Sequence, residues 1–535
     1  MPGPDAFRLP RTVEPVRYEL TITPDVQSST FSGEERIRLR VAEPVDRIVL
    51  NAAELAVTAA ELVPAAGGPG TGQRVLVAHD DAAERVTLSP NEPLGPGTWD
   101  LLLRFDGRLN DKLRGFYRST FKDDAGTEHV IATTQFEATD ARRAFPCWDE
   151  PDCKAVFSVA LVVDPGLTAV SNGRVVAEEV RPDGRRRITF EDTMPMSTYL
   201  VAFVVGALSA TAATDVDGVP VRVVHVAGKE HLTGFAREVA AHALRFFTRW
   251  FGLPYPSGKL DHIAIPDFAF GAMENLGAVV YRESVLLIDP ETATRDEMER
   301  VAEVIAHETA HMWFGDLVTM RWWNGIWLNE AFATFMEMLC VDAFRPEWER
   351  WSTFAVSREG AMAIDGLGST RPIEFPVGQP DEAEAMFDVL TYQKGAGVLR
   401  MLERYLGAEA FRQGIGRYLE AHAHGNTETR DLWDALEGSS GQPARAIMDS
   451  WILQGGHPLV TARLAADGLH LRLTQRRFRY LGGGYLGGGH PGGGQDPPDE
   501  VWQIPLRMRL GAADDDRDDR EVRLLMTGAA IDVEL

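Results

Sequence analysis

Residues 301–335 read VAEVIAHETAHMWFGDLVTMRWWNGIWLNEAFATF, and this stretch decides how the rest of the chain is interpreted. His307 and His311 are four residues apart, so on a helix both imidazoles lie on one face and can reach one metal ion. Glu308 then flanks a water bound to that metal. Glu330 follows in an apolar run. Two histidines, one carboxylate and an open position form the ligand set of a hydrolytic zinc site, which indicates a peptidase.

The flanking residues predict two helices that carry these ligands. Thr294 with Glu297 three residues later forms a capping box, which predicts a helix start, and Gly315 is a stop signal. A second helical stretch begins near Leu328 and ends before Pro346. Two antiparallel helices would present all three ligands to one point. The alternative is a pair of buried histidines that hydrogen-bond within a helical core.

Length and charge set the broad class of the protein. With 535 residues the chain is too long for one core, so two to four domains are expected. Hydrophobic residues at 44% and charged residues at 25% are ordinary values for globular proteins. The formal charge of −25 argues against nucleic acid and anionic membranes as partners.

The cellular compartment is predicted from three features: a secretory leader, a membrane-spanning segment and the number of cysteines. The N-terminal residues contain no apolar segment of a secretory signal, and the longest apolar run, 199–208, is too short to cross a bilayer. Cys147, Cys153 and Cys340 are too few for a disulfide framework. We therefore expect a cytoplasmic protein.

The pattern of apolar and polar residues changes twice along the sequence, which predicts three domains. Residues 1–206 alternate between apolar and polar, for example at Tyr18, Leu20 and Ile22, and predict a large antiparallel sheet. Residues 207–456 contain the metal motif and are mostly helical, which predicts an α+β catalytic domain.

Alternation returns in residues 457–535, as at Val460, Ala462 and Leu464, which predicts a β module. Within it, the glycine-rich stretch 481–498 is expected to be a flexible surface loop. The whole chain is therefore predicted to be a multidomain α+β protein.

Several motifs together resemble one enzyme family. They are HETAH (307–311), WLNEAFATF (327–335), GAMEN (271–275), TYQKGAGVLRML (391–402) and TQFEATDARRAFPCWDEPDCKA (134–155). Together, and in their order along the chain, they resemble the motifs of the M1 zinc metallo-aminopeptidases of the aminopeptidase N type, which are gluzincins. The resemblance implies a saddle-like N-terminal β domain, a thermolysin-like catalytic domain and a C-terminal β-sandwich.

The resemblance also implies a mechanism. His307, His311 and Glu330 would hold one Zn²⁺ per chain, which lowers the pKa of a bound water and polarises the scissile carbonyl. Glu308 would be the general base that passes the water proton to the leaving amine. Tyr392 would donate a hydrogen bond to the oxyanion.

Substrate contacts follow from the same resemblance. The edge of the GAMEN strand would pair with the peptide by β-augmentation, because its small side chains allow close approach. Glu274 and Glu137 would bind the free α-amine, so that the expected substrates are peptides with a free N-terminus. Phe270 would line the first side-chain pocket, with an ordinary core position as the alternative. The expected substrate-binding residues are Glu137, Phe270, Gly271, Ala272, Met273, Glu274 and Asn275.

Three other functions remain to be weighed. A thermolysin-like endopeptidase shares the zinc motif but needs neither GAMEN nor Glu137. The leukotriene-hydrolase branch of the family has a tyrosine five residues before Tyr392, where this chain has Phe387. A non-catalytic scaffold would keep the fold without the site, although every catalytic position here is intact.

The end of the sequence carries one more expectation. Family members usually continue into a long helical domain that covers the active site, and this chain stops at Leu535 in an apparent strand. We expect the helical domain to be absent, the β-sandwich to be incomplete and the zinc cleft to be open. An unfinished sandwich exposes an apolar face or strand edge, which favours self-association or a partner. The alternative is that the chain is a fragment of a longer gene product.

Overall fold

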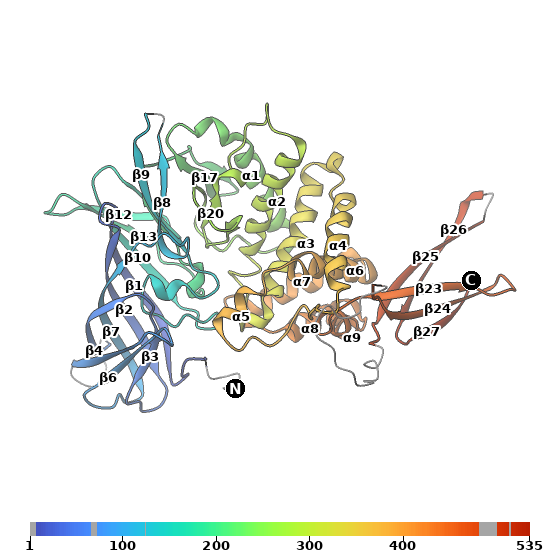
Figure 1. Ribbon diagram of the computed structural model, residues 1–535, viewed down its shortest axis with the longest axis horizontal. Helices are drawn as coiled ribbons and strands as arrows, with labels where there is room; N and C mark the ends of the chain where they lie inside the picture. Colours follow the sequence, from blue (N-terminus) through green and yellow to red (C-terminus); the bar gives the residue numbers. More distant parts are fainter. Residues whose placement is uncertain (1–6, 66–71, 124, 481–499, 513–514) are drawn as a thin grey trace.

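The computed structural model describes residues 7–65, 72–123, 125–480, 500–512 and 515–535. Figure 1 shows a strand-rich N-terminal region, a central region of helices around a small sheet, and a group of C-terminal strands, arranged along the longest axis. The predicted multidomain α+β class is confirmed. The glycine-rich stretch 481–498, with its predicted surface loop, lies outside the described residues.

The N-terminal region is built on a ten-stranded sheet. Its strands, in sheet order, are β12 (Val175–Val180), β13 (Arg186–Phe190), β10 (Val156–Val163), β1 (Val13–Asp25), β2 (Thr30–Val41), β7 (Gly97–Arg108), β4 (Ala56–Pro64), β5 (Gln73–Asp80), β6 (Arg85–Pro90) and β3 (Ile48–Asn51). The alternating residues Tyr18, Leu20 and Ile22 are buried, as the pattern predicted. The sheet is not wholly antiparallel, because β1 and β10 pair in parallel.

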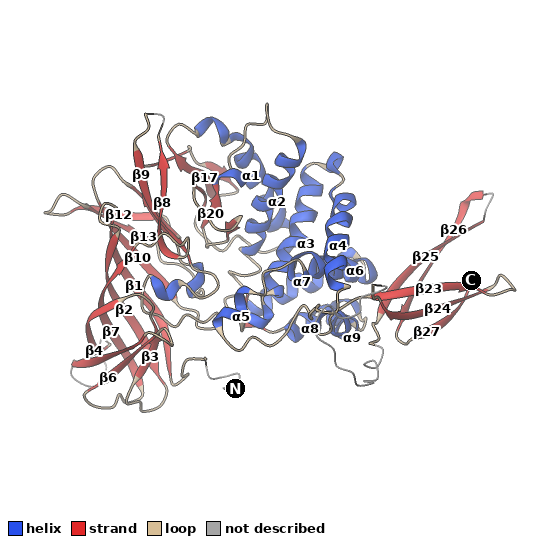
Figure 2. Cartoon of the chain, in the orientation of Figure 1, coloured by secondary structure: helices blue, strands red, loops and turns tan. Residues whose placement is uncertain are grey.

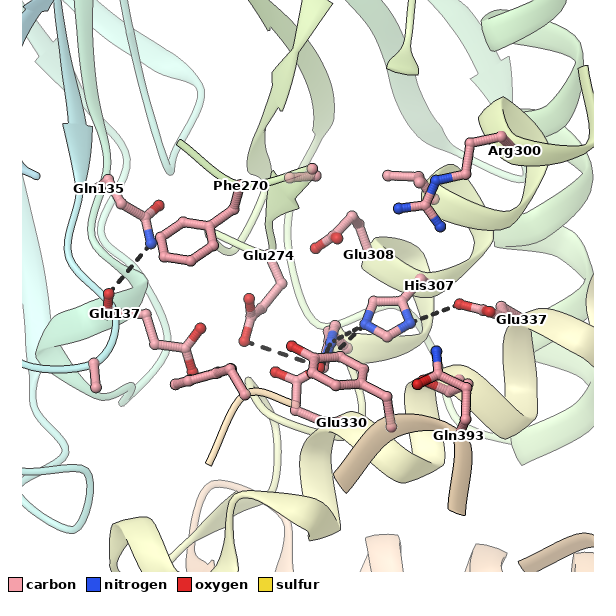
Figure 3. Close-up of a pocket in the computed structure, with 18 of the residues that line it drawn as sticks. Gln135, Glu137, Phe270, Glu274, Arg300, His307, Glu308, Glu330, Glu337 and Gln393 are labelled. Atoms are coloured by element: carbon pink, nitrogen blue, oxygen red, sulfur yellow. Dashed lines mark hydrogen bonds and ion pairs between the residues drawn. The ribbon is translucent and has the colours of Figure 1, made fainter. Parts of the chain in front are cut away.

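A four-stranded sheet packs against the large one. Its order is β11 (Thr168–Ser171), β14 (Phe203–Gly206), β9 (Glu128–Gln135) and β8 (Gly115–Lys122). Phe31 of β2 meets Phe116 of β8 edge to face, with ring centroids 5.1 Å apart. The chain leaving β9 carries Glu137 toward the central region (Figure 3).

One buried residue in this otherwise apolar core has an ionisable side chain. Glu35 on β2 is 3% exposed and shares the inward face with Phe31 and Ile37. Neither of its carboxyl oxygens has a hydrogen-bond partner among the described residues. Burial raises the pKa of Glu35 well above its ordinary range, because the charged form is poorly solvated there.

We expect Glu35→Gln to become progressively more stable than the parent as the pH rises above about 5. The unfolded chain ionises Glu35 in its ordinary range while the folded chain holds the proton, so the parent loses stability through that window. The difference should grow by up to about 1.4 kcal/mol per pH unit. Urea unfolding between pH 5 and pH 8 measures it.

Glu34→Gln is the matched control for this experiment. Glu34 lies on the opposite face of β2, with its side chain 67% exposed and 3.3 Å from Arg104. Its substitution should give a stability difference that stays constant with pH. A Glu35→Gln curve parallel to that of the parent would contradict the assignment.

The central region combines a small mixed sheet with nine helices among the described residues. The sheet order is β15 (Leu208–Ala210), β17 (Val219–Val226), β18 (Leu260–Ile265), β20 (Ala278–Arg282) and β19 (Ala272–Met273), with β16 (Thr214–Val216) paired to β17. The helices are α1 (Gly234–Phe251), α2 (Arg295–His311), α3 (Trp327–Phe344), α4 (Arg350–Asp365), α5 (Pro380–Glu384), α6 (Gly395–Leu406), α7 (Ala408–His422), α8 (Thr429–Ser440) and α9 (Ala444–Ile452). Figure 2 shows these helices gathered between the two strand-rich parts.

The two helices that carry the metal motif begin where local signals predicted. Thr294 caps α2, and its side chain and that of Glu297 complete the capping box. Helix α3 begins at Trp327 and packs against α2. Helix α2 ends at His311, four residues before the predicted stop at Gly315. In the turn that follows the helix, His311 Nδ1 lies 2.8 Å from the Phe314 carbonyl oxygen.

The C-terminal strands form two small sheets. One contains β23 (Pro458–Leu464), β24 (His470–Arg477) and β27 (Ala530–Glu534), and the other contains β25 (Ile504–Ala512) and β26 (Asp515–Met526). Their shared core is small: Leu473, Trp502, Ile504, Met526 and Val533. In the described part of the chain, no helix is long and apolar enough to cross a membrane.

Candidate metal centre and peptide site

Helices α2 and α3 bring three possible metal ligands to one point. His307 and His311 lie one turn apart on α2, and Glu330 lies in the first turn of α3. The distance between the two Nε2 atoms is 3.0 Å, and Glu330 Oε2 lies 3.2 Å from His307 Nε2 and 3.4 Å from His311 Nε2. Figure 3 shows His307 and Glu330 at the centre of the site.

This triangle fits a zinc ion. A tetrahedral ion bonded to nitrogen and oxygen at 2.0–2.1 Å holds its ligands roughly 3.3–3.4 Å apart. The three measured edges lie within a few tenths of an ångström of that spacing. Two imidazoles and one carboxylate are also the donors of hydrolytic zinc sites, which keep a fourth position open.

The far nitrogen of each imidazole is held by another group. His307 Nδ1 lies 2.7 Å from Glu337 Oε2, and His311 Nδ1 lies 2.8 Å from the Phe314 carbonyl. Partners of this kind fix the ring orientation and the tautomer, so both Nε2 atoms face the common point. Glu337 was missed in the sequence, although it lies seven residues after Glu330 and therefore on the same face of α3.

Glu308 lines the same pocket and is 6% exposed. Burial raises the pKa of Glu308 to about 8, because the charged form is poorly solvated there and the attraction of the two imidazoles offsets this only in part. A carboxyl group that holds or releases a proton near neutral pH suits a proton carrier.

Tyr392 lies in a single wide helical turn, Leu390–Lys394, in front of α6. Its ring stacks on His307 with centroids 6.0 Å apart, and it lines the pocket. Burial raises the pKa of Tyr392 well above its ordinary range, so its hydroxyl keeps its proton. The turn is anchored at its end, because Lys394 Nζ binds Asp365 at 2.9 Å and the Gly456 carbonyl at 3.1 Å.

Two further carboxylates lie beside the metal site. An oxygen from each of Glu137, Glu274 and Glu330 falls within 4.8 Å of the other two. One oxygen of Glu137 and one of Glu274 are buried without a hydrogen-bond partner among the described residues. Burial, together with the charge of Glu274, raises the pKa of Glu137, and burial also raises the pKa of Glu274. Such a pair suits a bound cation, because a positive charge would offset both the desolvation of the carboxylates and the repulsion between them.

Ala272 and Met273 of the GAMEN motif form the edge strand of the central sheet. Strand β19 pairs with β20 on one side, and no described strand pairs with its other side. Ala272 and Glu274 line the pocket, whereas Met273 and Asn275 are buried away from it. Alternation along a strand explains this split.

The other residues in and next to the GAMEN motif lie in different environments. Asn275 Nδ2 donates to the Val201 carbonyl at 3.3 Å, which ties the strand to the N-terminal region. Gly271 lines the pocket, and so does Phe270, which is 43% exposed and therefore not an ordinary core aromatic. Phe387, at the position considered for an extra tyrosine, lines it too.

The pocket itself has a volume of about 240 Å³. Besides Phe387, eight lining residues were not assigned to the site from the sequence: Gln135, Ala138, Arg300, Val304, Thr334, Glu337, Glu384 and Gln393. Helical spacing was the available signal for two of them, because Arg300 lies seven residues before His307 and Val304 lies three before it. Gln135 and Gln393 carried no comparable signal.

Comparison with known families agrees with this geometry. Residues 14–200 match the model of the peptidase M1 N-terminal domain, and residues 235–451 match that of the peptidase family M1 domain. Together the two models cover more than half of the chain.

Curated relatives give the same result. The chain is 43% identical to "Aminopeptidase M1" of Arabidopsis thaliana over 508 residues, which are 94% of this chain and 56% of the relative. It is 39% identical to "Puromycin-sensitive aminopeptidase" of Caenorhabditis elegans over 512 residues, covering 95% of this chain and 53% of the relative. The chain spans about half the length of the curated relatives it matches. On its two domain matches and these identities, the chain belongs to the peptidase M1 family.

Proposed function

We propose that this chain is a zinc-dependent aminopeptidase, which removes the N-terminal residue from peptides. The observation that carries the proposal is the pair of carboxylates Glu137 and Glu274 beside the metal triangle, each with one buried oxygen that has no hydrogen-bond partner among the described residues. We further propose that residues 1–206, 207–456 and 457–535 act as separate domains, with Glu137 supplied by the first and the remaining site residues by the second.

The hydrolytic step divides among the residues of the pocket. Zinc, when bound, supplies a polarised carbonyl and a water of lowered pKa. Glu308 accepts the proton of the attacking water and delivers it to the leaving amine. Tyr392 donates a hydrogen bond to the oxygen on which negative charge develops, and it does so without moving far because its turn is anchored.

The carboxylate pair explains why the N-terminus is selected. An α-ammonium group placed between Glu137 and Glu274 pairs with both, whereas an internal peptide segment leaves them buried without a partner. The amine is thereby fixed close to the metal site, with room for one residue before the scissile bond. A thermolysin-like endopeptidase has no use for such a pair, and this disfavours that alternative.

Removal of the metal tests the proposal as a whole. The zinc-loaded chain should hydrolyse a leucyl anilide reporter, dialysis against a chelator should abolish the activity, and one equivalent of Zn²⁺ per chain should restore it. Activity that persists in metal-free protein would contradict the proposal.

Glu274→Gln tests the role of the amine-binding pair. The substitution keeps the shape of the side chain and removes its charge, so kcat/KM on peptides with a free N-terminus should fall about 10²-fold while zinc content stays at that of the parent. Glu291→Gln, an exposed position outside the pocket, is the control. An unchanged kcat/KM in Glu274→Gln would show that the amine is held elsewhere.

A further inference from the structure

Arg300 is the one arginine or lysine among the described residues that line the pocket. It lies on α2, two turns before His307. In Figure 3 it occupies the end of the site opposite Glu137, with Glu274, Glu308 and His307 between them. All other charged side chains of the lining, apart from the histidines, are carboxylates: Glu137, Glu274, Glu308, Glu330, Glu337 and Glu384.

The guanidinium of Arg300 is available to a ligand. Arg300 is exposed, and its one charge interaction with another described residue is an attraction to Glu303 that involves no hydrogen bond. Glu303, one turn further along α2, is paired instead with Arg350. Arg300 therefore offers a guanidinium whose hydrogen-bond donors can bind a ligand at one end of a strongly acidic pocket.

The direction of a bound peptide follows from the edge strand. If the amine lies at Glu274, then a peptide that pairs with the free edge of β19 must run antiparallel to it, back past Ala272 toward Gly271. A parallel peptide would leave the pocket at its first residue. Residues after the scissile bond therefore pass Gly271.

Arg300 stands beside this exit. Its Nη2 atom lies 3.6 Å from the position that a Cβ on Gly271 would occupy. Gly271 precedes Glu274 by three residues, which is about 10 Å of extended chain. That length carries a peptide from its amine to the first or second residue beyond the cleaved bond.

We propose that Arg300 is a specificity-determining residue that binds a carboxylate one or two residues beyond the cleaved bond. The inference rests on the proposed function. An arginine fork binds a carboxylate through two parallel hydrogen bonds, so the favoured substrates are short peptides whose own C-terminal carboxylate reaches it. An acidic side chain at the same place is the second source of this chemistry.

Paired peptides test the proposal. For the parent protein, kcat/KM should be about tenfold higher for Leu-Gly-Gly than for its C-terminal amide, mainly through KM, because a charge-assisted hydrogen bond is lost in the amide. In Arg300→Gln the ratio should fall to about one, and Arg300→Lys should recover part of it. Arg249→Gln, an exposed arginine of α1 outside the pocket, should keep the ratio of the parent.

The amides of Leu-Asp-Gly and Leu-Asn-Gly distinguish the two sources of the carboxylate. If the parent prefers the aspartyl peptide and Arg300→Gln does not, then Arg300 also binds an acidic side chain of the substrate. Equal values for acid and amide in the parent, or a ratio that Arg300→Gln leaves unchanged, would overturn the proposal.

A binding measurement separates this inference from the proposed function. Calorimetric titration of the zinc-loaded protein with Leu-Gly-Gly and its amide reports on Arg300 even if nothing is hydrolysed. Tighter binding of the acid that is lost in Arg300→Gln would support Arg300 while absent hydrolysis contradicts the aminopeptidase. Binding that does not distinguish the two peptides would overturn the role of Arg300, whatever the activity.

Discussion

The Glu308→Gln protein should bind zinc like the parent and lose about 10³-fold in kcat. General acid–base catalysis contributes about 10²–10⁴-fold, and glutamine neither accepts the water proton nor delivers one to the leaving amine. The amide has nearly the shape of the carboxyl that it replaces.

Zinc content per chain and the unfolding midpoint are the controls for this variant. Both should match the parent, because Glu308 is not among the three converging ligands. The kinetic readout is kcat on a leucyl anilide. Activity within about tenfold of the parent would refute Glu308 as the proton carrier.

Tyr392→Phe should lower kcat by about 10²–10³-fold and leave KM nearly unchanged. A hydrogen bond to the oxyanion forms mainly in the transition state, so its loss appears in kcat rather than in ground-state binding. Phenylalanine keeps the ring that stacks on His307, so the metal site should stay intact. Steady-state kinetics on a short peptide separate the two constants.

Tyr405→Phe is the matched control. That tyrosine lies on α6 outside the pocket, where its hydroxyl bonds Gln442 at 3.1 Å, and its substitution should leave both constants unchanged. A change in KM alone for Tyr392→Phe would rule out the transition-state role.

The parts predicted from sequence are those encoded by short-range rules. A capping box at Thr294 and spacings of three and four residues predicted α2, because helix caps and helix faces depend on near neighbours. The sequence motifs identified Glu330, Glu274 and Glu137. These residues come from three separate segments, and the fold places one carboxylate oxygen of each within 4.8 Å of the other two.

The parts not predicted depend on packing between distant segments. The parallel pairing of β1 with β10 joins strands more than a hundred residues apart, and alternation alone does not report the direction of a neighbour. In the sequence, Glu337 and Arg300 resemble ordinary charged residues on a helix surface. In the folded chain Glu337 contacts His307, and Arg300 lies beside Gly271. The burial of Met273 depends on which side of β19 faces the core, and that of Asn275 on its contact with the N-terminal region.

Comparison of a free with a blocked N-terminus tests the aminopeptidase proposal most directly. The zinc-loaded chain is incubated with Leu-Gly-Gly and with N-acetyl-Leu-Gly-Gly, and release of the first residue is followed for each. The account predicts that acetylation lowers kcat/KM at least about 10²-fold, because it removes the ammonium that pairs with Glu137 and Glu274. Cleavage of the acetylated peptide at the same rate as the free one would contradict the account.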